Sequence, residues 1–160
     1  MSLQPATQGT AGIAPDLLQR LRKRLADSPA LGWLSPSLDE LGLDTCVLSL
    51  PVREQVTNGS GTVHGGVLAM LADTAVAFAL ATNFDGKMGF ATADMTIHFL
   101  RRARGNVRAR ARIIKKGQRV NVGEVEIVDG AGREVARALA TFILTTSSFD
   151  YAPERKQGKP

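Results

Sequence analysis

Cysteine, histidine and aromatic residues are all scarce in this chain of 160 residues. Cys46 is the only cysteine, so an intrachain disulfide and a CxxC metal pair are excluded. Because Cys46 lies in an apolar, strand-like run without a basic neighbour, we expect its thiol to be buried and unreactive. The two histidines, His64 and His98, stand in different predicted elements and form no metal-binding pair, so we expect no metal site.

Long hydrophobic runs are also missing. The longest apolar stretch, Val67 to Ala81, has 15 residues and is interrupted by Asp73 and Thr74, whereas a membrane span needs about 20 residues. Residues 1–14 lack the basic region and the apolar stretch of a signal peptide. These absences predict a cytoplasmic protein without a membrane partner.

The charge is unbalanced toward the basic side. Lysine and arginine number 20 against 15 for aspartate and glutamate, which favours an anionic ligand such as a phosphorylated small molecule. Nucleic-acid binding usually needs aromatic side chains among the basic ones. Aromatic residues make up 5% of the chain and none lies among the arginines of 101–119, so we expect no nucleic-acid partner.

The length and the hydrophobic fraction of 44% fit one globular domain. We expect this domain to span residues 15–148, between a flexible N-terminal tail, 1–14, and a flexible C-terminal tail, 149–160. No internal repeat or linker divides it.

The periodicity of apolar residues changes along the domain. It predicts an amphipathic helix at 15–26 and a longer, wholly apolar helix at 67–82. Alternation predicts strands at 43–52, 89–100, 106–116, 119–128 and 133–145, the last four as a meander of hairpins. Because a helix that is apolar on all sides must be wrapped, we predict an α+β fold, with a curved antiparallel sheet of four to six strands around one central helix.

Asp73 is the only acidic side chain of the long apolar helix. A lone buried carboxylate is unfavourable unless it is paired or functional. Asp73 therefore either lies on a face that reaches solvent or a salt bridge, or acts as a general base or a nucleophile. Gly65 and Gly66 precede this helix, where the first N–H groups have no internal partner. They form either a plain flexible turn or an oxyanion site that a carbonyl oxygen can approach closely.

Spacing constrains how these groups could act together. Gly65 and Asp73 are eight residues apart, roughly 12 Å along one helix, so they cannot both touch one carbonyl carbon. If both serve one reaction, Asp73 must come from a second chain, and two helices packed antiparallel about a two-fold axis would create two identical sites.

Two further residues each have two possible roles. His64 is structural or binds a ligand, and Asn58 positions a water or forms an Asn-Gly turn.

Arginines alternate along the strand that follows the central helix. Arg108, Arg110 and Arg112 share one face, and Glu124 and Glu126 share one face of the next predicted strand. Cross-strand pairing would make this a solvated, charge-balanced face. The basic residues at turns, among them Arg101, Arg102 and Lys116, are better candidates for phosphate contacts.

The combined pattern closely resembles the hotdog-fold acyl-CoA thioesterases of the phenylacetate-pathway (PaaI-like) type. The residues that carry the resemblance are Asn58, His64-Gly65-Gly66 and Leu71-Ala72-Asp73-Thr74, with similar later segments at 94–100 and 105–107. The likeness covers residues 43–146. It implies that Asp73 activates water or attacks the thioester, and that the Gly65 N–H polarises the thioester carbonyl.

The resemblance also implies roles for the neighbouring residues. His64 would help to hold the site, Asn58 would position the water or the thioester, and Thr92 falls near a hydroxyl residue that assists the water. Coenzyme A would lie along subunit interfaces of a homodimer or of a homotetramer built as a dimer of dimers. The residues expected to hold it are Gly66, Arg101, Arg102 and Lys116.

The expected reaction is hydrolysis of an acyl-CoA to a free acid and CoA, with no metal and no cofactor, since CoA is part of the substrate. Aromatic and medium-chain acyl groups both stay open, and Phe78, Phe84, Met88, Phe90 and Leu100 are candidates for lining the acyl pocket. Two alternatives remain: a hydratase or dehydratase on the same fold, and a non-catalytic acyl-CoA sensor.

Overall fold

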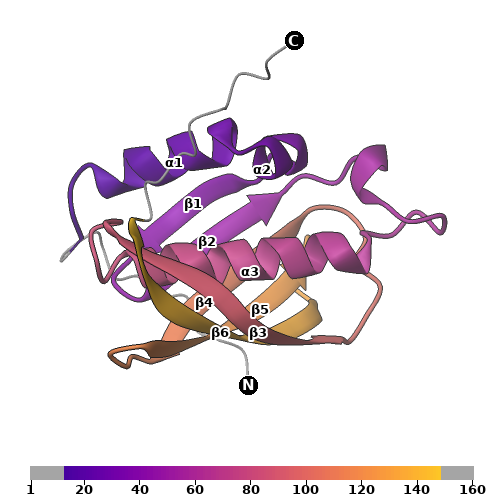
Figure 1. Ribbon diagram of the computed structural model, residues 1–160. Helices are drawn as coiled ribbons and strands as arrows, with labels where there is room; N and C mark the ends of the chain where they lie inside the picture. Colours follow the sequence, from indigo (N-terminus) through magenta and orange to yellow (C-terminus); the bar gives the residue numbers. More distant parts are fainter. Residues whose placement is uncertain (1–12, 149–160) are drawn as a thin grey trace, which may run out of the picture.

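The computed structural model describes residues 13–148 (Figure 1). Two helices, α1 (Leu17–Asp27) and α2 (Pro29–Leu34), lead into strands β1 (Ser37–Gly42) and β2 (Thr45–Leu50). A turn of 3-10 helix, η1 (Glu54–Val56), precedes the long helix α3 (Gly65–Ala81). The remaining strands are β3 (Met88–Phe99), β4 (Val107–Lys115), β5 (Val120–Asp129) and β6 (Glu134–Ser148). The expected tails lie outside the described residues, apart from Ile13 and Ala14, which pack against the core.

The expectation of a sheet wrapped around a central helix is confirmed. All six strands form one antiparallel sheet in the order β1-β2-β4-β5-β6-β3, and this sheet curves around α3 (Figure 1). Alternate residues of the central strands face the helix, as Val107, Ala109 and Ala111 do in β4. At Gly123 of β5 the helix comes so close that a Cβ atom would stand 2.4 Å from Cγ1 of Val76. Small residues on the sheet therefore let α3 sink into its concave face.

The expected meander is only partly right. Strands β4, β5 and β6 follow one another as neighbours, but β3 pairs with β6 along its whole length and lies at the edge of the sheet. The segment between β3 and β4 therefore runs from the β3 edge past β6 and β5 to the middle of the sheet, where β4 pairs with β2 and β5. Apolar alternation predicts that a segment is a strand, but it does not say which neighbour the strand will pair with, and this accounts for the error.

The sequence does not predict β1 or α2. Strand β1 carries the acidic pair Asp39 and Glu40, and its register with β2 shifts between Leu38 and Glu40, so its alternation is broken. Helix α2 is only 6 residues long, too short for a periodic signal.

The amphipathic helix expected at 15–26 is confirmed as α1, which begins two residues later than expected. It buries Leu17, Leu21 and Leu25. In Figure 1, α1 and α2 lie above the face of β1 and β2.

The single cysteine is buried, as its sequence context predicts. Cys46 lies in β2 with 1% of its surface exposed, and burial raises the pKa of its thiol well above the ordinary range. A thiol of this kind is chemically inert at neutral pH.

None of the helices within residues 13–148 has the length and apolar character that a membrane span needs.

The hairpin between β5 and β6 is closed by one buried carboxylate. Asp129 accepts hydrogen bonds from the backbone N–H groups of Ala131 and Arg133, and from Nε and Nη2 of Arg133 at 3.0 and 2.7 Å. These bonds, the Arg133 side chain foremost, hold the pKa of Asp129 below its ordinary value. The carboxylate therefore stabilises the fold while it is ionised.

We expect Asp129→Asn to lower the free energy of unfolding at neutral pH by about 1.5–3 kcal/mol, the range for hydrogen bonds to charged groups. Because folding lowers the pKa of Asp129, its contribution is present above the ordinary aspartate pKa and is lost as the pH falls. Urea unfolding of both proteins from pH 7 to pH 3 checks this. A stability difference that stays constant across that range would contradict the assignment.

Candidate active site

Helix α3 begins with most of its free N–H groups already occupied. His64 is the N-cap residue, and its ring Nδ1 accepts a hydrogen bond of 2.9 Å from the N–H of Gly66. The carbonyl oxygen of His64 accepts from the N–H groups of Val67 and Leu68. Within residues 13–148, no acceptor takes the N–H of Gly65. The helix start therefore offers a single backbone donor to an external oxygen, and it belongs to Gly65.

A phenyl ring lies against Gly65. A Cβ atom built on Gly65 would stand 3.2 Å from Cζ and 3.3 Å from Cε1 of Phe99, so a side chain at position 65 would shift the ring by a few tenths of an ångström. Phe99 and Gly65 line one cavity of about 360 Å³, which we call the helix-start cavity. The other residues that line it are Thr62, Val63, Leu68, Leu100, Arg101, Arg102 and Ala103.

Asp73 has a hydroxyl partner on the neighbouring strand. The Oγ1 atom of Thr92 in β3 donates a hydrogen bond of 2.7 Å to Oδ1 of Asp73, whose side chain is half-buried. A β-bulge in β3 lets Thr92 face α3 together with residues at odd-numbered positions later in the strand. The register with β6 shifts between Thr92 and Asp94, so Ala93 is an extra residue and reverses the alternation that follows it. As a result Thr92 and Phe99, an odd number of residues apart, both face α3.

A second cavity, of about 270 Å³, lies beside Asp73, and we call it the carboxylate cavity. Phe78, Phe90 and Phe142 line it, with the rings of Phe90 and Phe142 edge to face at a centroid distance of 5.6 Å. The N-terminal helices contribute Arg24 and Leu31 to its wall. The remaining residues that line it are Asp73, Thr74, Ala77, Ala91 and Thr92.

The carboxylate and the free N–H are kept apart within one chain. Gly65 and Asp73 lie on the same unbroken helix, roughly 12 Å apart along its axis, and they line different cavities. One chain therefore does not bring them to one substrate atom. The helical spacing that the sequence predicts is confirmed.

Asn58 takes part in a turn. Its Oδ1 accepts hydrogen bonds from the backbone N–H and hydroxyl of Ser60 and from the backbone N–H and hydroxyl of Thr62. This turn is tied to the helix start, because the N–H of His64 donates to Val56 and that of Val63 to Ala103. The oxygen of Asn58 thus has four donors within the turn, and its role in positioning a water or the thioester stays a prediction.

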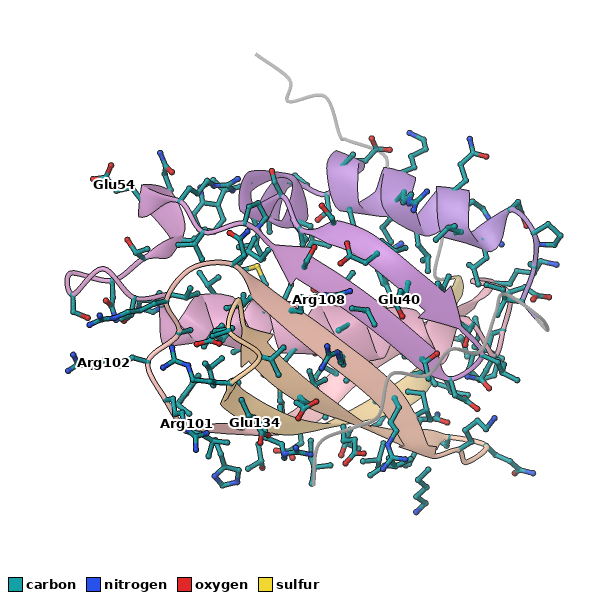
Figure 2. All side chains as sticks on the ribbon, turned by 180° about the vertical axis from the view of Figure 1, so that it is seen from behind. Glu40, Glu54, Arg101, Arg102, Arg108 and Glu134 are labelled. Atoms are coloured by element: carbon teal, nitrogen blue, oxygen red, sulfur yellow. The ribbon has the colours of Figure 1, made fainter. Side chains whose placement is uncertain are left out.

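The alternating arginines of β4 are balanced by acids, as cross-strand pairing predicts. Arg110 lies 3.7 Å from Glu126, and Arg112 pairs with Glu124. Arg108 contacts Glu40 at 3.3 Å, and Figure 2 shows these two side chains together on the outer face of the sheet. This face is a charge-balanced ladder.

The three basic candidates for phosphate contacts do not lie together. Arg101 and Arg102 line the helix-start cavity; Nη1 of Arg101 donates to the carbonyl of Glu134 at 2.8 Å, and Arg102 points away from the domain (Figure 2). Lys116 is beyond the other end of α3, where its Nζ binds Asp44 at 2.8 Å and Asn83 at 3.1 Å. Of these three candidates, Arg101 and Arg102 line the cavity that Gly65 also lines, and Lys116 does not.

Known proteins resemble this chain in sequence and in fold. A family model described as a domain of unknown function (DUF4442) matches residues 21–144. The acyl-coenzyme A thioesterase PaaI of Escherichia coli is 38% identical over 113 residues, which are 69% of this chain and 76% of PaaI. The chain belongs to this family of hotdog-fold, PaaI-like thioesterases. It is a thioester hydrolase.

Two further likenesses agree with the family. A protein of Halobacterium salinarum, provisionally named an esterase, is 32% identical over 123 residues, 74% of this chain and 82% of its own length. A solved structure of a thioesterase-superfamily protein superposes with a TM-score of 0.73 and 28% identity, covering 81% of this chain and 98% of that one. The fold of this thioesterase is therefore the hotdog fold.

Sequence reasoning missed several residues of the two cavities. Phe78 and Phe90 are expected in an acyl pocket and do line the carboxylate cavity, but Phe99, Phe142, Arg24 and Leu31 are not expected in either. Phe142 pairs with Thr92 only because β6 lies beside β3, and no local pattern indicates that pairing. Phe84 and Met88 line neither cavity, and Leu100 lines the helix-start cavity.

Thr92 offers a direct test of the carboxylate site. We expect Thr92→Val, which keeps the shape and removes the hydroxyl, to lower kcat by about ten-fold, because a hydrogen bond to a charged group is lost. Thr92→Ser keeps the donor and should retain most of the activity. Steady-state kinetics on an acyl-CoA substrate checks this. Equal activity of the valine and serine variants would show that the hydroxyl has no role.

Proposed function

We propose that this thioesterase hydrolyses an acyl-CoA with an aromatic or medium-chain acyl group, in active sites shared between two chains of a homodimer. The observation that carries the proposal is that the two reactive groups lie apart on α3. The Thr92-supported carboxylate of Asp73 and the free N–H of Gly65 lie on one rigid helix, in separate cavities. A two-fold related chain supplies the missing half of each site.

The chemistry follows from these groups. Asp73 of one chain takes a proton from a water molecule, whose oxygen attacks the thioester carbonyl carbon. Negative charge collects on the carbonyl oxygen, and the N–H of the partner's Gly65 donates a hydrogen bond to it. The carbon–sulfur bond then breaks, and the proton passes from Asp73 to the CoA sulfur. Direct attack by Asp73, with hydrolysis of the resulting anhydride, is the alternative route to the same products.

Strand β3 supports the shared site. It is 12 residues long, forms one edge of the sheet and exposes most of its side chains, Phe99 among them; Leu100, the next residue, is also exposed. A long exposed edge strand is a site for pairing with another chain. Pairing along β3 would place a second α3 beside the first, which the shared site requires.

The carboxylate cavity supports an aromatic acyl group. Its volume of about 270 Å³ lies just below the range of about 300–1,000 Å³ for drug-sized ligands, so it suits an acyl group rather than a whole acyl-CoA. Three phenylalanine rings give it the apolar, aromatic wall that a ring prefers. The CoA phosphates would then lie outside it, where Arg101 and Arg102 adjoin the helix start.

The reaction is tested by measuring free thiol released from a panel of acyl-CoAs: phenylacetyl, hydroxybenzoyl, and straight chains from short to long. We expect the wild type to act on the aromatic members and Asp73→Asn to lose about two to four orders of magnitude in turnover. The control is Glu54→Gln, which removes an exposed carboxylate from η1, away from β3, and should keep full activity. Tight binding without release would favour the sensor alternative, and a hydrated or dehydrated thioester product would favour the hydratase alternative.

The shared site is tested by complementation. Asp73→Asn and Gly65→Pro each remove one half of the site; proline lacks the N–H and is tolerated at the first helical position. Mixing and reassembling the two inactive proteins should restore about a quarter of the wild-type activity, because half of the dimers are mixed and each has one intact site. Each variant reassembled without the other is the control and should stay inactive. No recovery in the mixed sample would place both groups in one chain.

A further inference from the structure

Phe99 is an exposed aromatic residue that core packing does not explain. Its side chain is 55% exposed, although it faces α3 from the end of β3. The ring contacts the helix at Gly65, within 3.2–3.3 Å of where a Cβ would stand. The contact therefore falls on the residue whose N–H is free.

The surroundings of this N–H are otherwise open. His64 and Gly66, on either side of Gly65, are exposed, and Gly65 itself is half-buried. A single N–H stabilises an oxyanion weakly in water and much more strongly where water is excluded. The large apolar side chains that line the helix-start cavity are those of Leu68, Phe99 and Leu100. The side chain of Phe99 is the one that a Cβ atom on Gly65 would meet.

The backbone holds this ring in place. Phe99 pairs with Ala136 of β6, and the N–H groups of the next two residues, Leu100 and Arg101, both donate to the carbonyl of Val135. The bulge at Ala93 turns Phe99 toward α3. The sheet thus fixes the backbone from which the ring projects.

We propose that Phe99 is a positioning residue of the active site, whose ring excludes water from one side of the Gly65 N–H and lies close enough to favour glycine at position 65. This inference rests on the proposed function, because it assigns Phe99 to the oxyanion site of that reaction. A methyl group at position 65 would leave the N–H in place and would shift the ring. Loss of activity in Gly65→Ala would then report on Phe99.

Kinetics of Phe99→Ala and Phe99→Leu test the first part. We expect Phe99→Ala to lower kcat by about ten-fold or more with KM changed by no more than about three-fold, since the shielding acts on the charge that develops in the transition state. Leucine restores apolar cover and should recover part of the kcat. The matched control is Leu139→Ala, which removes a 49% exposed leucine from β6 and should keep the wild-type kcat and melting temperature.

A double-mutant cycle with Gly65→Ala tests the second part. In the wild-type background we expect Gly65→Ala to lower kcat by up to about ten-fold and by no more than Phe99→Ala does, because the change acts through the shifted ring. In the Phe99→Ala background the methyl group has room, and the same change should lower kcat by no more than about three-fold. The coupling between the two positions is the signature of the contact.

The outcomes separate the two proposals. Two outcomes would overturn the role of Phe99 and leave the proposed reaction in place. One is an equal effect of Gly65→Ala in both backgrounds, and the other is an unchanged kcat of Phe99→Ala in an active enzyme. An unchanged kcat with a lowered melting temperature would reduce Phe99 to a structural residue and overturn it likewise. A wild-type protein that releases no CoA from any acyl-CoA would remove the reaction itself, and the role of Phe99 with it.

Discussion

The rigidity of α3 is the constraint on which the arrangement of this thioesterase depends. The helix runs unbroken from Gly65 to Ala81 inside a curved sheet, and its rise of about 1.5 Å per residue fixes the separation of Gly65 and Asp73. No side-chain rotation or loop movement can close that distance. The proposed assembly across a two-fold axis follows from this rigidity, since a second copy of the same helix is the simplest source of the missing group.

The hydrogen bonds around the helix start leave one donor for chemistry. His64 caps Gly66 through its ring and two further residues through its carbonyl, and Asn58 shapes the preceding turn. These residues of the expected catalytic group thus hold the backbone around Gly65. The proposed water-excluding role of Phe99 adds the environment that a lone N–H donor needs.

The basic excess of the chain is not spread evenly over the fold. The arginines of β4 and β6 meet acids on the outer face of the sheet, where Glu126, 2% exposed, lies between Arg110 and Arg137. Arg101 and Arg102, on the loop after β3, adjoin the helix-start cavity. An anion therefore meets positive charge at this end of α3, and the ladder on the outer face presents balanced charge instead. This distribution fits a phosphorylated substrate bound at a discrete site better than an extended polyanion.

Much of the fold and part of the site could be predicted from the sequence, for local reasons. The period of the apolar residues determined the central helix and five strands, and the eight-residue spacing of Gly65 and Asp73 determined that they cannot act together in one chain. The tertiary structure alone decided that β3 pairs with β6, that the bulge at Ala93 aims both Thr92 and Phe99 at α3, and that Arg24 reaches the carboxylate cavity. The physical reason is that pattern and spacing act along the chain, whereas strand pairing and side-chain neighbours depend on the order in which the strands join the sheet.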